Sequence, residues 1–226
     1  MELLLDGGWI LYEESMEMDR EQAHRVPTQP GNGFPVTLPC DVHGPLIAAG
    51  ILPEPLEALQ ADACRWVEDR SWWFLNRFEV PDGLLDADKV FLSLEMLDAN
   101  ADLFLNGHPL GHHRNTFSAF EADVLPWLVP GENLLKIRMT AGHETVDESE
   151  LGFLRPFVCT EGDRSPRPEA PRGDWRRTGL RKPQYVYGWD WGPRVVTCGI
   201  GGPVRLRSDR ILRFLSDLAQ TLSLLP

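Results

Sequence analysis

Hydrophobic and polar positions alternate along the middle of the chain. Between Lys89 and Leu97, the side chains of Val90, Leu92 and Leu94 fall on one side and polar or aromatic ones on the other. Leu134 to Met139 alternates in the same way. A period of two places successive side chains on opposite faces of a strand, so the pattern predicts strands with one buried face.

Turn residues separate these strands from others. Ser71 to Val80 is rich in aromatic and apolar residues, and Ala101 to Leu105 ends at Asn106-Gly107, a pair typical of a tight hairpin because both central residues take positive φ. Short strands with turns between them predict an all-β fold of the sandwich class. The remaining predicted strands are Leu3–Glu13 with a break at Gly7 and Gly8, Val36–Pro39, Phe117–Val124, Val195–Cys198 and Val204–Arg207.

Three stretches have helical spacing instead. Asp41 stands at an N-cap position ahead of a short helical turn that ends at Gly50. Pro55 to Val67 and Ser208 to Leu225 repeat apolar residues every three or four positions. We therefore expect short helices near the N-terminus and a C-terminal helix added to the sandwich.

The length of the chain fits one large domain. We expect a single domain over residues 1–207, followed by a tail at 208–226 that begins a linker to another domain. Residues 143–183 contain five prolines and many charges, and we interpret them as a long insertion whose most mobile part is Glu161 to Asp174.

Composition and charge narrow the range of partners. The formal charge of −12 argues against nucleic acid or an anionic membrane as a partner and is compatible with a neutral ligand. The four cysteines show no metal-ligand spacing, so we expect reduced thiols in a cytoplasmic protein, with no metal and no cofactor. The N-terminus has no signal-peptide pattern, and no apolar run is long enough to span a membrane.

The segment RKPQYVYGWDWGPR, Arg181 to Arg194, carries the candidate chemistry. It places one carboxylate, Asp190, between Trp189 and Trp191. Indole faces can stack on the C–H faces of a sugar, and a carboxylate can accept hydrogen bonds from its hydroxyl groups. The alternative interpretation is that both tryptophans belong to the core and Asp190 is a turn residue.

The same segment resembles a hallmark of a known family. GWDWGP, Gly188 to Pro193, resembles the β-mannosidase branch of glycoside hydrolase family 2. Pro39 to Pro55 resembles the segment that opens β-mannosidase domains, and Met96 to Met139 resembles the core of the family's N-terminal sugar-binding domain. The resemblance extends from about Trp9 to about Leu206.

The resemblance implies a jelly-roll β-sandwich, like a galactose-binding domain, that packs against a catalytic (β/α)8 barrel. It implies that Trp189, Asp190 and Trp191 contact the sugar, with Asp190 as hydroxyl acceptor and one indole as a stacking surface. Gln184 and Arg181 are weaker candidates that could instead hold the loop in place. The chain departs from the family pattern at Pro183, Val186 and Tyr187 and in the segment after Gly199.

No catalytic pair is assigned. Retaining glycosidases use two carboxyl groups roughly 5–5.5 Å apart. In the resembling family both are barrel glutamates, one of which follows an asparagine, and no Asn-Glu pair occurs in the sequence. We therefore expect no hydrolysis by this chain alone.

Three functions stay open. The first is an accessory domain of a β-mannosidase-like hydrolase, whose partners are a β-mannoside or manno-oligosaccharide and the barrel. The second is a free-standing carbohydrate-binding module, and the third is a structural docking domain. Exposed tryptophans would also favour a homodimer through the Trp-rich face.

Overall fold

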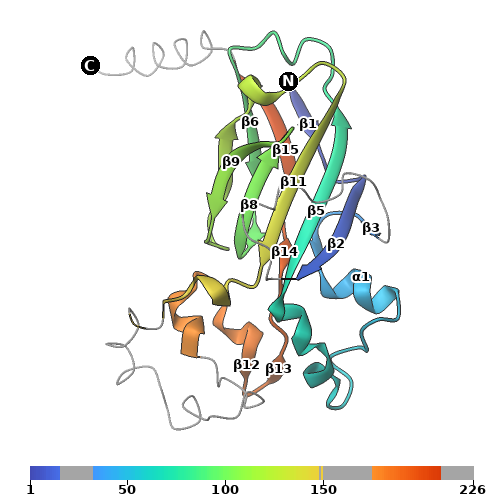
Figure 1. Cartoon of the computed structure of the whole chain (residues 1–226), viewed down its shortest axis with the longest axis vertical. Helices are drawn as coiled ribbons and strands as arrows, with labels where there is room; N and C mark the ends of the chain where they lie inside the picture. Colours follow the sequence, from blue (N-terminus) through green and yellow to red (C-terminus); the bar gives the residue numbers. More distant parts are fainter. Residues whose placement is uncertain (16–32, 148, 150–174, 210–226) are drawn as a thin grey trace, which may run out of the picture.

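Two antiparallel sheets make up most of the structure, a computed structural model that describes residues 1–15, 33–147, 149 and 175–209 (Figure 1). The larger sheet has the strand order β3-β2-β5-β11-β8-β9, and the smaller has the order β1-β15-β6-β10. The larger sheet consists of β2 (Trp9–Ser15), β3 (Phe34–Val36), β5 (Arg70–Glu79), β8 (Asn100–Leu105), β9 (His108–His113) and β11 (Glu132–Thr140). The smaller consists of β1 (Glu2–Leu4), β6 (Lys89–Leu94), β10 (Phe120–Asp123) and β15 (Val204–Asp209).

Shorter elements lie outside the two large sheets. A three-stranded sheet has the order β4-β14-β7, and β12 pairs with β13 as a separate hairpin. These short strands are β4 (Cys40–Asp41), β7 (Leu97–Asp98), β12 (Tyr187–Trp189), β13 (Gly192–Arg194) and β14 (Gly199–Ile200). The helices are α1 (His43–Ala48) and the 3-10 helices η2 (Gln60–Asp69), η3 (Leu125–Trp127), η4 (His143–Thr145), η6 (Trp175–Gly179) and η7 (Gln184–Val186).

The hydrophobic core lies between the two large sheets. Trp72 and Phe74 of β5 and Ile137 of β11 form one cluster with Leu92 of β6 and Leu206 of β15. Each fully buried side chain of the size of Leu or Phe contributes about 1.5–3 kcal/mol through the apolar surface that it removes from water. This shared core confirms the predicted all-β sandwich.

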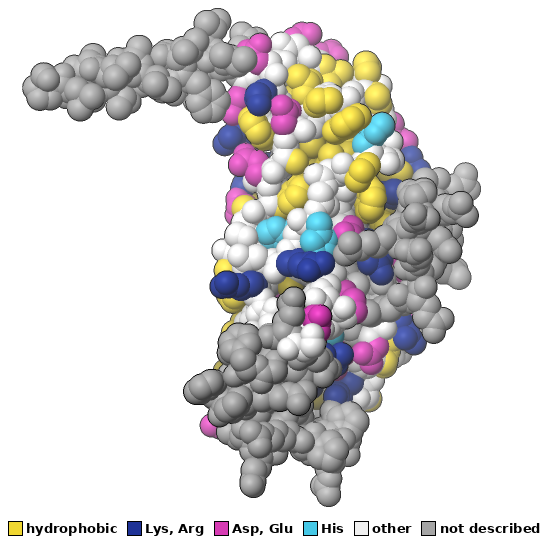
Figure 2. Space-filling model, turned by 60° about the vertical axis from the view of Figure 1, so that its left-hand side comes forward, with side chains coloured by type: hydrophobic (Ala, Val, Ile, Leu, Met, Phe, Trp, Pro, Cys, Tyr) yellow, Lys and Arg dark blue, Asp and Glu magenta, His cyan; other side chains and the backbone are white. Residues whose placement is uncertain are grey.

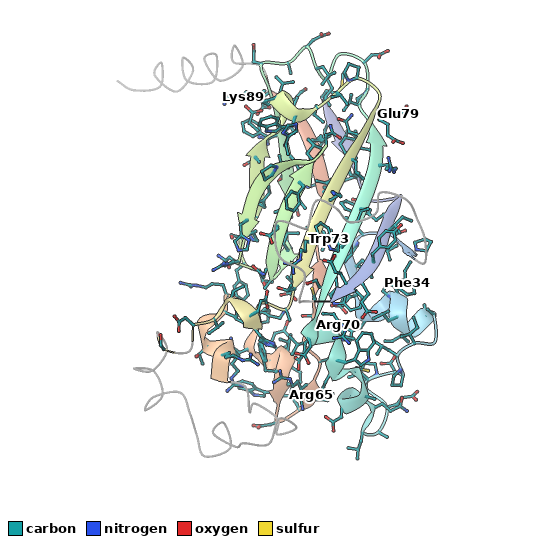
Figure 3. The ribbon with its side chains drawn as sticks, viewed as in Figure 1. Phe34, Arg65, Arg70, Trp73, Glu79 and Lys89 are labelled. Atoms are coloured by element: carbon teal, nitrogen blue, oxygen red, sulfur yellow. The ribbon has the colours of Figure 1, made fainter. Side chains whose placement is uncertain are left out.

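Strand β5 is one of the two middle strands of the larger sheet and is buried on both faces. Figure 3 shows Arg70 and Glu79 at its opposite ends. Trp72 and Phe74 face the core, whereas Trp73 and Leu75 join a second apolar cluster with Tyr12, Phe104 and Leu134. Burial on both faces explains why its sequence is almost continuously apolar rather than alternating.

The strongest sequence patterns predict strands that the structure contains. The alternating stretch after Lys89 forms β6, with Val90, Leu92 and Leu94 buried, and the stretch after Leu134 lies within β11. Asn106 and Gly107 have φ values of 51° and 85° and connect β8 to β9, as the hairpin prediction requires. Gly7 and Gly8 separate β1 from β2, which belong to different sheets.

Several other predictions are corrected by the structure. The stretch from Pro55 becomes helical only at Gln60 and is a 3-10 helix, with Leu56 and Leu59 exposed instead of buried. Val195–Cys198 is not a strand, because its backbone bonds go elsewhere: the Val195 N–H donates to the Val186 carbonyl, and the Cys198 N–H donates to the Asp41 carboxylate.

The structure also corrects the predicted starts of two helices. The N-cap of α1 is Val42, and Asp41 belongs to β4, although its carboxylate accepts the His43 N–H at 2.9 Å. Ser208 and Asp209 continue β15 instead of starting a helix, since they pair with Val90 and Lys89. The rest of the predicted C-terminal helix, and the stretch Glu161 to Asp174, lie outside the described residues.

Candidate functional site

The sequence RKPQYVYGWDWGPR folds into a short hairpin at the end of the sandwich opposite to the N-terminus (Figure 1). Tyr187 pairs with Arg194 and Trp189 pairs with Gly192, so Asp190 and Trp191 are the two turn residues. Gly188 has a φ of 94°, a conformation that side-chain-bearing residues rarely adopt. This requirement explains the glycine before the Trp-Asp-Trp sequence.

The tip of the hairpin is exposed. Trp191 is 72% exposed, Trp189 is 42% exposed, and the Asp190 side chain also belongs to an exposed residue. Tyr185 is 54% exposed, and its ring centroid lies 6.0 Å from that of Trp191. The interpretation of the two tryptophans as core residues is therefore wrong for this chain, while Asp190 is indeed a turn residue. The arrangement offers aromatic faces, which can stack on a ligand, beside one carboxylate, which can accept hydrogen bonds.

The base of the hairpin is buried. Tyr187 and Val186 belong to a small apolar cluster with Ala141 and Val196, separate from the main core. The Tyr187 hydroxyl lies 3.1 Å from His143 Nε2, and the two rings are 5.4 Å apart. The hairpin thus has an apolar base and a polar, aromatic tip.

Arg194 and Glu68 form a buried ion pair beside this base. Arg194 Nη2 donates to Glu68 Oε1 at 2.8 Å and to Oε2 at 2.9 Å, and Arg194 Nε donates to Oε1 at 3.2 Å. Burial raises the pKa of the Glu68 carboxyl, and the charge and hydrogen bonds of Arg194 oppose this rise. Glu68 comes from η2, far from the hairpin in sequence, so no local pattern could have indicated this pair.

The two weaker site candidates, Gln184 and Arg181, make hydrogen bonds to neighbouring segments of the chain. Gln184 Nε2 donates to the carbonyl of Arg177 at 2.9 Å and to that of Lys182 at 3.3 Å. The Arg181 carbonyl accepts the Thr116 N–H at 2.9 Å, while the residue itself is exposed. These contacts place both residues before the hairpin, at positions where they hold the incoming chain.

A buried polar cluster that the sequence did not indicate lies next to them. Lys182 Nζ lies 2.5 Å from Asp98 Oδ1 and donates to the Thr197 carbonyl at 2.5 Å. The Asp98 carboxylate also accepts hydrogen bonds from the hydroxyl groups of Thr116 and Thr197, at 2.8 and 2.5 Å. The cluster ties the chain before and after the hairpin to β7.

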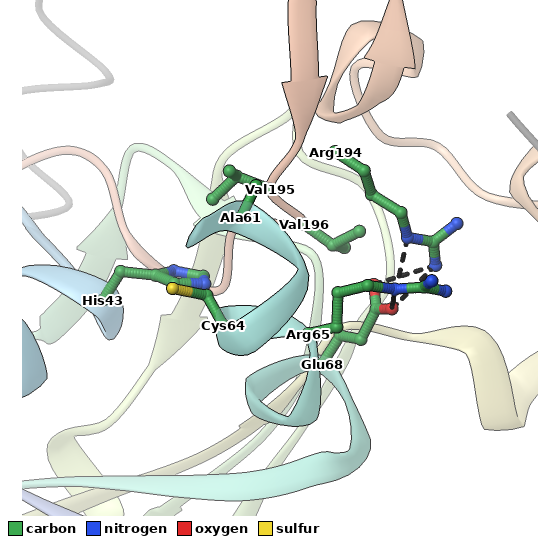
Figure 4. A pocket seen from close by; sticks show the side chains of 8 residues that line it. All are labelled: His43, Ala61, Cys64, Arg65, Glu68, Arg194, Val195 and Val196. Atoms are coloured by element: carbon green, nitrogen blue, oxygen red, sulfur yellow. Dashed lines mark hydrogen bonds and ion pairs between the residues drawn. The ribbon is translucent and has the colours of Figure 1, made fainter. Parts of the chain in front are cut away.

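A small pocket adjoins the base of the hairpin (Figure 4). His43 and Cys64 lie on one side, and Glu68 and Arg194 on the other. Its cavity volume is about 10 Å³, enough for about one water molecule and far too small for a sugar ring. A sugar that contacts the tip of the hairpin therefore binds outside this pocket.

Metal ligation and thiol chemistry find little support in the described part of the chain. Residues 1–15, 33–147, 149 and 175–209 contain no group of three His, Cys, Asp or Glu side chains that could hold a metal ion. Burial and the Asp41 charge raise the pKa of the Cys40 thiol to about 11, and burial also raises the pKa of Cys64. Thiols with raised pKa values are poor nucleophiles at neutral pH. None of the helices within the described residues is long and apolar enough to cross a membrane.

Relatives of this chain are β-mannosidases. The chain is 28% identical over 180 residues to a probable β-mannosidase of Caenorhabditis elegans, covering 77% of this chain and 19% of the relative. It is 33% identical over 204 residues to β-mannosidase B of Emericella nidulans, covering 90% of this chain and 22% of the relative. The chain thus spans about a fifth of the length of these relatives.

Solved structures agree with the sequence relatives. The crystal structure of a β-D-mannosidase from Dictyoglomus thermophilum matches with a TM-score of 0.72 and 28% identity, over 93% of this chain and 23% of that one. Residues 17–202 match the family described as the glycosyl hydrolase 2 galactose-binding domain-like family. The resemblance inferred from the sequence is confirmed, and the chain belongs to this family.

Proposed function

We propose that this chain is the N-terminal accessory domain of a β-mannosidase-like glycoside hydrolase and supplies its Trp-Asp-Trp hairpin to a sugar pocket. In this proposal Asp190 accepts hydrogen bonds from sugar hydroxyl groups, and Trp189 or Trp191 stacks on the sugar ring. The observation that carries the proposal is the exposed carboxylate between two exposed indoles at the tip of a hairpin with a buried base.

The hairpin by itself supplies only part of a pocket. Sites for small ligands are concave and bury most of the ligand surface, whereas Trp191 is 72% exposed and the adjoining cavity holds about one water molecule. The catalytic barrel of the parent protein would complete the site and supply the two catalytic carboxyl groups. The share of the β-mannosidase relatives that this chain spans, 19% and 22%, is compatible with a separate catalytic domain.

The barrel and a β-mannoside are thus the proposed partners, and the chain alone is proposed to be inactive. We also propose a cytoplasmic location. The free cysteines of the described residues, Cys40, Cys64 and Cys198, support a reducing compartment.

The decisive variant is Asp190→Asn, tested in the parent protein that carries both this chain and the barrel. A hydrogen bond to a charged acceptor contributes roughly 1.5–3 kcal/mol, so we expect kcat/KM on an aryl β-mannoside to fall about 10- to 100-fold. Asp82→Asn, an exposed turn residue after β5, is the control and should leave activity unchanged. Unchanged kinetics in Asp190→Asn would rule out the proposed role of the hairpin.

Titration of the isolated chain separates the remaining functions. We expect no saturable binding of mannose or manno-oligosaccharides by calorimetry, because half of the pocket is missing. Saturable binding that Asp190→Asn abolishes would instead identify a free-standing binding module. Parent activity that is insensitive to Asp190→Asn, together with no sugar binding, would leave a docking domain.

A further inference from the structure

The hairpin that carries Asp190 and Trp191 is short. Two residue pairs, Tyr187 with Arg194 and Trp189 with Gly192, connect its strands, and the Val195 N–H donates to the Val186 carbonyl next to them. A two-stranded hairpin is at best marginally stable in water, even when it is longer than this one. The contacts at the base of the hairpin therefore help to set the location of Asp190.

Buried side chains from η2, from η4 and from both strands of the hairpin meet at that base. The Glu68 carboxylate of η2 receives three hydrogen bonds from Arg194 of β13, and Arg65 Nε lies 3.7 Å from the same carboxylate (Figure 4). The Arg194 guanidinium lies 5.3 Å from the ring centroid of Tyr187, its partner across the hairpin. Tyr187 in turn contacts His143 of η4 through its hydroxyl and its ring. Glu68, Arg194, Tyr187 and His143 thus form a continuous row, which we name the anchor row.

Every member of the anchor row is buried. Glu68 and Arg194 are each 8% exposed, and Tyr187 has no exposed surface. A buried ion pair is a weak source of net stability, because desolvation offsets the attraction between the charges, and apolar residues of similar volume often replace it without loss. The pair does fix the orientation of the two side chains relative to each other, because the planar guanidinium and the carboxylate fit each other in only a few geometries.

We infer that Glu68 is a positioning residue for the sugar site: through Arg194 and Tyr187 it fixes where the hairpin presents Asp190 and Trp191. The inference rests on the proposed function of the hairpin. Glu68 does not touch the sugar in this view. It holds the base of the hairpin against η2 while His143 holds it against η4, so the tip is placed from two sides.

The experiment compares three variants. Glu68→Gln removes one charge of the pair, and Glu68→Met with Arg194→Met removes both while it keeps the side-chain volumes similar. Glu132→Gln is the matched control, because Glu132 pairs with Arg77 at 2.6 Å on the surface. If the pair contributed to stability alone, the double methionine variant would recover the melting temperature, and with it the hydrogen-exchange rates of the hairpin and the activity of the parent protein.

The first readout needs no sugar. Hydrogen exchange in the full chain should become at least about 10-fold faster at the backbone amides of residues 187–192, 194 and 195 in Glu68→Gln and in the double variant, with β5 and β11 unchanged. The double variant should show this increase even where its melting temperature matches that of the original chain. Unchanged exchange at the hairpin in the double variant would overturn the inference.

The second readout is activity in the parent protein with its barrel. Misplacement of a substrate-contacting group is costly, so we expect kcat/KM to fall about 10- to 100-fold in Glu68→Gln and in the double variant, but not in Glu132→Gln. If Asp190→Asn lowers activity and the Glu68 variants do not, the positioning role is refuted while the proposed function stands. If Asp190→Asn itself has no effect, the proposed function fails, and the inference falls with it.

Discussion

Lys182 carries its ammonium group into the interior, where its side chain has no exposed surface. A buried charge is tolerated only with partners, and Asp98 and Thr197 supply them at 2.5 Å. Asp98 in turn accepts from Thr116, which belongs to the loop between β9 and β10. One carboxylate therefore joins the chain just before the hairpin, the chain just after it and the loop between β9 and β10.

Asp98→Asn should destabilise the protein strongly. The substitution leaves the Lys182 charge buried without its counter-ion, which costs about 3–5 kcal/mol. For a chain of this length we expect a fall in melting temperature of about 10 °C, measured by calorimetry. Glu132→Gln, the same carboxyl-to-amide change in a surface ion pair, should cost less than about 1 kcal/mol. Equal effects of the two substitutions would show that the Lys182 pair is no more important than a surface contact.

At the scale of elements, the sequence predicts the sheet strands well and the connecting segments poorly. Strands β6 and β11 follow from alternation, because one face of each must be buried against a common core. Val195–Cys198 has the same composition as a strand but is not one, since the Cys198 N–H is satisfied by the Asp41 side chain. Local patterns carry no information about a partner that lies elsewhere in the sequence.

In the candidate site, too, the sequence predicts some residues and misses others. Its exposed residues, Trp189, Asp190 and Trp191, could be identified from the sequence because an acid between two indoles is unusual chemistry for a strand. The residues that hold the base of the hairpin could not be identified from the sequence. Glu68 and His143 come from distant elements, and their roles depend on contacts with Arg194 and Tyr187 that only the fold creates.

Replacing a glycine by alanine should have opposite effects on stability in a turn and in a helix of this fold. A Cβ atom added at Gly107 or at Gly44 would meet nothing within 4 Å, so steric clash affects neither position. Gly107 has a φ of 85° in the β8–β9 hairpin, whereas Gly44 lies in α1. Gly107→Ala should therefore cost about 1–2 kcal/mol of unfolding free energy. Gly44→Ala should add about 0.5–1 kcal/mol, because alanine favours the helix and restricts the unfolded chain.

Urea unfolding of both glycine variants measures these changes. Opposite signs would show that backbone conformation decides the effect at each position. The same sign in both variants would contradict this explanation, since the available space at the two sites is equivalent.

At the scale of the whole molecule, the hairpin and the N-terminus lie at opposite ends of the sandwich (Figure 1). Strand β15 pairs with β1 through Glu2 and Arg207, so the last described residues lie beside the N-terminus. A barrel that contacts the hairpin would therefore lie at the end away from the point where β15 leaves the sandwich. Trp189, Trp191 and Tyr185 would then be covered in the parent protein and exposed in the isolated chain.

Exposed aromatic residues at the hairpin end should make the isolated chain self-associate. Aromatic side chains commonly dominate the energy of protein interfaces, and truncation of one often costs about 2 kcal/mol. We expect a concentration-dependent dimer in analytical ultracentrifugation, which Trp191→Ala weakens at least about 10-fold. The matched control is Trp127→Ala, because Trp127 in η3 is 38% exposed and stacks on His108 at 4.2 Å, away from the hairpin.

This control is needed because exposed apolar surface is not confined to the hairpin. Figure 2 shows hydrophobic side chains gathered over the upper half of another face, above a band of His, Lys and Arg side chains. If Trp127→Ala weakens the dimer and Trp191→Ala does not, the association surface includes Trp127, and the hairpin does not drive self-association. A chain that stays monomeric at all concentrations would show that three exposed aromatic rings are too little apolar surface to bind a second copy. In that event the proposed contact between the hairpin and a barrel would depend on the polar contacts of Asp190 and the backbone as well as on the rings.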